Sequence, residues 1–172
     1  MTPRLTLIAA VSADGFISAG KGVPWDLPKD REHFRAYTSG KWLLLGHQTY
    51  EEMLGWFSNH HPLVLSRDAK FLPFNGERVA TVQEALNLTQ KANQKELVVC
   101  GGSGAFSAAL PEADQLVITH VNHLLGGGVP FPSFSQKEWE PVERTAYDRD
   151  DTHAYSFAIV TYQRVAHYDR AA

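Results

Sequence analysis

The chain has 172 residues, of which 44% are hydrophobic and 20% charged, and this composition is typical of one soluble globular domain. The formal net charge of -3 and the scattered basic residues argue against nucleic acid or an anionic membrane as a partner. The apolar run near the N-terminus breaks at residues 12–14, too early for a signal peptide or a membrane span, so we expect a cytoplasmic protein. Cys100 is the only cysteine, which excludes an intramolecular disulfide and a multi-cysteine metal site.

Short apolar runs alternate with helical patterns over the first two thirds of the chain. A capping box, Thr81-Val82-Gln83-Glu84, opens one of the expected helices. The alternation favours an α/β fold with a mainly parallel sheet. In chain order we expect a strand at 5–11, a helix at 29–37, a strand at 42–45, a helix at 49–54, strands at 63–65 and 78–80, a helix at 82–91, a strand at 96–100, a helix at 104–110 and a strand at 115–121.

The last third has a different pattern. Residues 138–147 and 153–165 read as two long strands joined by the polar turn 148–152. We therefore expect an antiparallel hairpin that closes one edge of the sheet. No repeat or linker indicates a second domain, so we predict one domain over residues 1–165 and a flexible tail at 166–172.

Asp30 is the most informative residue. It lies in the segment 24–34, where Pro28 marks a first helical turn and Phe34 follows Asp30 by four residues on the same helix face. A carboxylate held against apolar neighbours can exchange protons or grip a cationic heterocycle near neutral pH. The alternative is that Asp30 only complements the helix macrodipole.

Two junctions combine a buried strand, glycine and a helix start, at 42–51 and 97–106. Each offers free amides to an anion, and together they could hold the two halves of a dinucleotide. Glycines at such places often serve only the turn, and neither junction has the spacing of a Rossmann fingerprint or a P-loop. Arg67, at the end of a third strand, could grip an extra phosphate or simply be solvated.

Metal and nucleophilic chemistry are not supported. His60 and His61 are adjacent, and His120 and His123 have no carboxylate near them in sequence, so we predict no metal site. Ser103 in Gly-Gly-Ser-Gly does not match the register of a nucleophile elbow.

From residue 5 to residue 165 the chain resembles the dihydrofolate reductase family. The resemblance implies a central, mostly parallel sheet of about eight strands with helices on both faces and an antiparallel last strand. It rests on these segments in this order: Ile8-Ala9-Ala10-Val11, Pro24-Trp25-Asp26-Leu27-Pro28-Lys29-Asp30 with Phe34, Gly46-His47-Gln48-Thr49-Tyr50-Glu51, Leu65-Ser66-Arg67, Gly101-Gly102 and Leu116-Val117-Ile118-Thr119-His120.

The resemblance also implies NADPH-dependent hydride transfer to dihydrofolate, giving tetrahydrofolate. Asp30 takes the place of the family's catalytic carboxylate, Thr119 supports it, and Trp25 lies beside a mobile loop at 18–23. The implied substrate-binding residues are Ile8, Arg31, Phe34, Met53, Phe57, His60 and Cys100. The implied cofactor-binding residues are Ala10, Ile17, Gly46, His47, Gln48, Thr49, Leu65, Ser66, Arg67, Gly101, Gly102, Ser103, Gly104, Ala105 and Phe106, with a cis peptide at Gly101-Gly102 and the 2′-phosphate at Ser66 and Arg67.

Two positions depart from the family pattern. His60 stands where the family has an arginine that pairs with the glutamate tail of folate, and a neutral imidazole is a poor substitute for it. Arg31 stands where the family usually has an apolar residue. It can turn outward along the helix, or face the substrate slot and compensate for His60.

Two other interpretations remain open at this stage. The segments 12–17 and 124–130 look like the reductase domain of riboflavin biosynthesis, which reduces a phosphoribosylaminopyrimidine with NADPH. A member without catalysis that binds a nucleotide is the second. For partners we expect a small pterin or pyrimidine substrate, no nucleic acid, no membrane, and a monomer or a homodimer.

Overall fold

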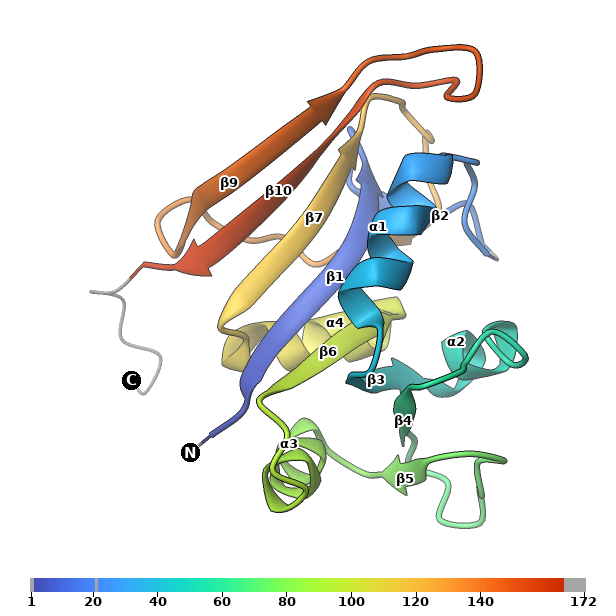
Figure 1. Ribbon diagram of the computed structural model, residues 1–172, viewed down its shortest axis with the longest axis vertical. Helices are drawn as coiled ribbons and strands as arrows, with labels where there is room; N and C mark the ends of the chain where they lie inside the picture. Colours follow the sequence, from blue (N-terminus) through green and yellow to red (C-terminus); the bar gives the residue numbers. More distant parts are fainter. Residues whose placement is uncertain (1, 21, 166–172) are drawn as a thin grey trace.

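The computed structural model describes residues 2–20 and 22–165, so the predicted tail at 166–172 lies outside the described residues. Eight strands form one sheet in the order β5-β4-β3-β6-β1-β7-β10-β9 (Figure 1). All pairings from β5 to β7 are parallel, whereas β10 is antiparallel to both β7 and β9. The predicted mostly parallel sheet with an antiparallel C-terminal hairpin is confirmed. The strands are β1 (Arg4–Ser12), β3 (Trp42–Gly46), β4 (His61–Leu65), β5 (Glu77–Val79), β6 (Glu96–Gly101), β7 (Gln115–Val121), β9 (Trp139–Tyr147) and β10 (Phe157–Arg164).

Helices cover both faces of the sheet, as predicted. In Figure 1, α1 lies in front of the sheet and α4 behind it. The strands alternate their side chains between two cores: Val98 of β6 packs with the α1 and α2 side, and its neighbours Leu97 and Val99 pack with the α3 and α4 side. All three side chains are fully buried, which is the expected environment for a central parallel strand. The helices are α1 (Pro28–Thr38), α2 (His47–Glu52), α3 (Val82–Lys91), α4 (Ser103–Ala109) and the short 3-10 helix η1 (Leu110–Glu112).

The hairpin differs from the prediction at its second strand. That strand begins at Phe157 rather than at residue 153. His153 instead closes the turn, where its backbone N–H and C=O both bond to Asp150, and its ring faces α1. The polar turn therefore extends through residue 156, because side-chain hydrogen bonds in it replace strand pairing.

A two-stranded sheet of β2 (Phe16–Ser18) and β8 (Val129–Pro130) was not predicted, because its strands have only three and two residues. The pair brings the chain after β1 against the segment before β9. Gly128 is required at their contact, since a Cβ there would lie 2.1 Å from the Ser18 carbonyl oxygen. The pair anchors one end of the predicted mobile loop at 18–23.

One buried carboxylate ties the N-terminal end of the sheet together. Glu96 is only 8% exposed and accepts hydrogen bonds from Thr6 Oγ1 and Tyr37 Oη, both at 2.6 Å. Lys41 Nζ lies 2.9 Å from the same carboxylate and Arg4 3.4 Å from it. Burial alone would raise the pKa of Glu96, but these hydrogen bonds outweigh it and hold the pKa below its usual value.

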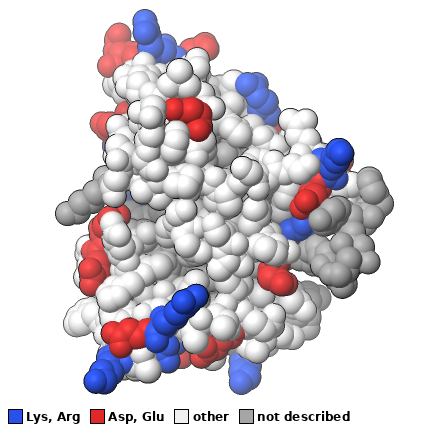
Figure 2. Space-filling view, turned by 180° about the vertical axis from the view of Figure 1, so that it is seen from behind, with Lys and Arg blue, Asp and Glu red and all other residues white. Residues whose placement is uncertain are grey.

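Charged side chains are spread around the rim of the face shown in Figure 2, and both signs occur there. Among the coloured residues of that face, neither sign gathers into one continuous patch. Among residues 2–20 and 22–165, no helix combines the length and apolar character needed to cross a membrane.

Candidate active site

A cavity of about 1220 Å³ opens at the carboxyl ends of β1, β3 and β6. These strands are parallel, so the residues that follow them meet at one edge of the sheet, where open α/β sheets bind ligands. The volume exceeds that of a typical pocket for one small molecule and leaves room for two ligands side by side. Helices α1 and α2 and the start of α4 complete its walls.

Asp30 points into the cavity from the first turn of α1, which begins at Pro28. Its Oδ1 accepts a hydrogen bond of 2.5 Å from Thr119 Oγ1, which reaches it from β7 on the far side of β1. Burial raises the pKa of Asp30, although the hydrogen bond from Thr119 and the charge of His33 oppose the shift. The site therefore holds a carboxyl group that keeps its proton to a higher pH than an exposed aspartate.

Two ring nitrogens of residues that line the cavity have no hydrogen-bond partner among the described residues. They are Trp25 Nε1 and His33 Nε2, and both are buried. Burial lowers the pKa of His33, and the charges of Asp30 and Glu143 oppose that shift. A ligand in the cavity that offers polar atoms to these two nitrogens would satisfy them.

Apolar side chains form the rest of this half of the cavity. Of the predicted substrate-binding residues, Ile8, Phe34, Met53 and Cys100 line it. The Cys100 thiol has a pKa raised by burial, so it is present as an inert, neutral group. An aromatic ring between these walls would be held on both sides by apolar contacts.

Phe57 and His60 were also predicted to bind the substrate, but neither residue lines the cavity. The Phe57 ring is partly buried and packs on Tyr50, with 5.7 Å between the ring centroids, against the core on the α2 side of the sheet. The His60 ring stacks on Trp56 at 4.6 Å, its Nδ1 accepts from the Ser58 N–H, and burial lowers its pKa. Trp56, which was not predicted, takes the place at the cavity wall.

Arg31 lines the cavity and forms an ion pair with Asp26. Its side chain is 55% exposed, so the guanidinium lies at the mouth of the cavity and not in its depth. Both possibilities drawn from the sequence therefore hold in part, because the side chain leaves the helix toward solvent and still borders the slot.

The two glycine junctions lie side by side, as expected. The register pairs Leu45 of β3 with Gly101 of β6, and a Cβ on Gly46 would come within 3.6 Å of the Gly102 nitrogen. The peptide bond Gly101–Gly102 is cis, as the resemblance implied, and a Cβ on Gly102 would lie 3.2 Å from Thr49 Oγ1. The three glycines thus leave a strip of backbone without side chains, which a ligand can approach closely.

The helices that follow these junctions leave their first amides free. Neither α2 nor α4 has a side-chain hydrogen bond at its N-cap. All the predicted cofactor-binding residues border the cavity, and Ser66 and Arg67 lie at its far end. The segment 80–83, at the start of α3, also borders it and was not predicted.

Within the described part of the chain, no group of three or more histidine, cysteine, aspartate or glutamate side chains could hold a metal ion. The cavity thus offers its ligands a carboxyl group, unpaired ring nitrogens, free backbone amides and apolar walls.

The family model for dihydrofolate reductase matches residues 4–164 of this chain. The chain belongs to the dihydrofolate reductase family. The sequence left three interpretations open, and the match supports a dihydrofolate reductase over the riboflavin-biosynthesis reductase domain and over a member without catalysis. The predicted α/β architecture of the family is the one observed.

Individual dihydrofolate reductases resemble the chain over nearly its whole length. The enzyme of Neisseria meningitidis serogroup A is 34% identical over 162 residues, covering 94% of this chain and 98% of that protein. The type 3 dihydrofolate reductase of Salmonella typhimurium is 31% identical over 160 residues, covering 93% and 98%. Among solved structures, the Enterococcus faecalis dihydrofolate reductase in complex with NADP(H) and the compound RAB-propyl superimposes with a TM-score of 0.82 at 29% identity, covering 94% and 96%.

Proposed function

We propose that this dihydrofolate reductase catalyses the NADPH-dependent reduction of dihydrofolate to tetrahydrofolate. The observation that carries the proposal is the hydrogen-bonded pair of Asp30 and Thr119 in the wall of a cavity large enough for two ligands. The family match over residues 4–164 supports the same reaction.

In this proposal Asp30 binds the pterin ring. A carboxylate can accept from the ring's amino group and from an adjacent ring N–H, and a carboxyl group with a raised pKa favours protonation of N5. Thr119 holds the carboxyl in place, and the unpaired Trp25 Nε1 is free to donate to the substrate or to a water on it. Phe34, with Ile8 and Met53, packs against the rings.

The cofactor half of the cavity fits NADPH. The side-chain-free strip at Gly46, Gly101 and Gly102 and the free amides at the starts of α2 and α4 suit a pyrophosphate. Ser66 and Arg67 suit the 2′-phosphate, with His47 nearby on the same wall. When bound, NADPH supplies the two electrons and one hydrogen that the pterin C6 accepts, while the second hydrogen enters N5 as a proton.

We propose that Arg31 binds the glutamate tail of the substrate. The family's arginine is absent, and His60 is turned onto Trp56 with a lowered pKa, so it offers no cation to the cavity. Arg31 is a cation at the mouth of the half that contains Asp30, and its partner Asp26 is 75% exposed and easily displaced.

Asp30→Asn tests the proposed reaction. We expect the variant to lose reduction of dihydrofolate at neutral pH, followed by the absorbance of NADPH, and to keep its affinity for NADPH measured by fluorescence. Because the folded protein raises the pKa of Asp30, ionising it costs stability as the pH rises through that pKa. The asparagine side chain carries no charge, so we also expect a Tm above that of the wild type at neutral pH and equal to it in acid.

The wild-type protein decides between the interpretations. Binding of NADPH without reduction of dihydrofolate would make a phosphoribosylaminopyrimidine the next substrate to assay. Failure to bind any nicotinamide dinucleotide would leave a member without catalysis.

Arg31→Leu tests tail recognition. A hydrogen-bonded charge pair at an exposed site contributes about 1 kcal/mol, so we expect KM for dihydrofolate to rise about fivefold. KM for a methyl-dihydropterin without the aminobenzoyl-glutamate tail should stay unchanged. Arg35→Leu, on the same helix and away from the cavity, is the matched control. Equal effects on the two substrates would contradict the assignment.

The cytoplasmic location, the absence of a nucleic-acid partner, and a monomeric or homodimeric state stay predictions from the sequence.

A further inference from the structure

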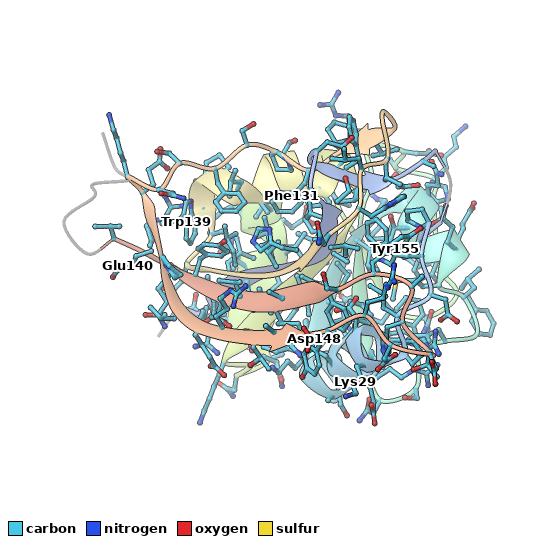
Figure 3. All side chains as sticks on the ribbon, turned by 90° about the horizontal axis from the view of Figure 1, so that it is seen from above. Lys29, Phe131, Trp139, Glu140, Asp148 and Tyr155 are labelled. Atoms are coloured by element: carbon cyan, nitrogen blue, oxygen red, sulfur yellow. The ribbon has the colours of Figure 1, made fainter. Side chains whose placement is uncertain are left out.

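The first turn of α1, which carries Asp30, takes its cap from a distant loop. Leu27 at the N-cap has no side chain that can accept a hydrogen bond, and Pro28 at the next position has no N–H. The backbone N–H of Lys29 donates instead to Nε2 of His153, at 3.1 Å and 124 residues away in sequence. Figure 1 shows the loop between β9 and β10 reaching over the start of α1, and in Figure 3 the labelled residues Lys29 and Asp148 lie on the same side of the molecule.

Asp150 determines which nitrogen of His153 can accept. The imidazole Nδ1 lies 2.8 Å from Asp150 Oδ1, and an ionised carboxylate can only accept, so Nδ1 carries the proton. Nε2 then has a free lone pair for the Lys29 N–H. The hydrogen bond from His153 is the largest cause that lowers the pKa of Asp150 to about 2, so the carboxylate stays ionised at neutral pH.

The loop holds this pair firmly. Asp150 Oδ1 also accepts from the backbone N–H groups of Thr152 at 3.0 Å and His153 at 2.8 Å. The His153 side chain is 3% exposed and packs on the Phe157 ring at 5.6 Å. The ring is thus held by an aromatic neighbour and by a carboxylate that two backbone N–H groups fix in turn, so it has little freedom to move away from α1.

We propose that His153 is a positioning residue for Asp30. The proposal rests on the proposed function. Asp30 directly follows Lys29, so the carboxyl group is held from two directions: His153 fixes the backbone before it, and Thr119 fixes its side chain. Both supports come from one unit, because β10 carries the His153 loop and pairs with β7, which carries Thr119. Small displacements of a catalytic group reduce the rate strongly, so the cap sets the geometry of the reaction as well as the start of the helix.

A pair of variants separates the two nitrogen contacts. In His153→Gln, the side-chain oxygen reaches the place of Nε2 and can accept from Lys29. In His153→Asn, the shorter amide reaches Asp150 and leaves the Lys29 N–H without a partner. We expect His153→Asn to lower kcat for dihydrofolate about tenfold while KM for NADPH changes less than about twofold, and His153→Gln to keep most of kcat.

Loss of stability alone is controlled by Thr89→Ala. Thr89 is buried on α3, its Oγ1 bonds to the Ala85 carbonyl, and it does not line the cavity. This variant should lower Tm without lowering kcat. Equal kcat in His153→Asn and His153→Gln, or a fall in kcat that Thr89→Ala reproduces at the same loss of Tm, would overturn the proposal.

Two NMR readouts test the same idea without activity. The Lys29 amide signal and the titration of the Asp30 carboxyl carbon should both change in His153→Asn and stay close to the wild type in His153→Gln. An unchanged Asp30 titration in His153→Asn would overturn the positioning role. A wild-type protein that reduces no dihydrofolate would refute the proposed function, while these spectra would still decide whether His153 positions Asp30.

Discussion

Thr119→Val isolates the hydrogen bond that holds the Asp30 carboxyl group. The two side chains have the same shape, and Thr119 is only 3% exposed, so the substitution removes the hydroxyl without opening a cavity. A hydrogen bond to a charged group contributes about 1.5–3 kcal/mol, and one pKa unit corresponds to about 1.36 kcal/mol. If the bond favoured only the ionised carboxylate, its loss would raise the pKa of Asp30 by about one to two units. The neutral carboxyl also bonds to the hydroxyl, so we expect a smaller rise of about 0.5–1 unit.

The sign of the effect on activity follows from the role of the proton. The reaction consumes a proton, and its rate falls as the pH rises through the pKa of the enzyme–substrate complex. We therefore expect Thr119→Val to move the alkaline limb of the kcat profile to higher pH by about 0.5–1 unit, measured by single-turnover oxidation of NADPH. Thr119→Ser keeps the hydroxyl and should follow the wild type. A shift to lower pH, or the same shift in both variants, would refute the assignment of Asp30 as the titrating group.

Two further substitutions test the supports of the site. Glu96→Gln should lower the free energy of unfolding by about 1–3 kcal/mol at neutral pH, because the folded pKa of Glu96 is depressed. This loss of stability should shrink as the pH falls from the unfolded pKa through the folded pKa. A difference that stays constant across that range in denaturant titrations would contradict the role of the Glu96 charge. Gly128→Ala places a Cβ 2.1 Å from the Ser18 carbonyl oxygen, so it should separate β2 from β8 and raise KM for NADPH. Gly127→Ala controls for backbone strain, because Gly127 also has a positive φ and a Cβ there meets nothing within 4 Å. Equal KM values in the two variants would show that the contact between β2 and β8 is not needed.

Sequence patterns predicted the layout of the sheet and most of the cavity. Buried apolar runs and the glycines after them identify β3 and β6, because a central strand leaves little choice of residue type and a positive φ, as at Gly101, favours glycine. Asp30 and Phe34 could be placed on one helix face from Pro28 and their spacing alone. These signals are local, so they can be read without knowing the neighbours in space.

The misses depend on contacts between distant segments. Residue counting placed His60 at the cavity, but in the structure its ring stacks on Trp56. Trp56 and Phe57 are adjacent aromatic residues outside any regular element, and no sequence periodicity shows which of the two lines the cavity. His153 fitted a strand by its neighbours' alternation, yet its ring bonds to Asp150 and to the amide of Lys29. The run Asp150-Asp151-Thr152 was the available signal for that turn, because aspartate side chains commonly form Asx turns with the backbone two residues on.

The placement of Thr119 has a consequence for how the protein is made. Its strand lies between β1, at the start of the chain, and β10, which ends at Arg164. During synthesis Asp30 therefore emerges from the ribosome long before β7, the strand that carries Thr119. One edge of β7 then stays unpaired until β10 has been synthesised. A nascent or truncated chain that ends before β10 should thus be unable to reduce its substrate, and its exposed strand edge makes it a target for chaperones.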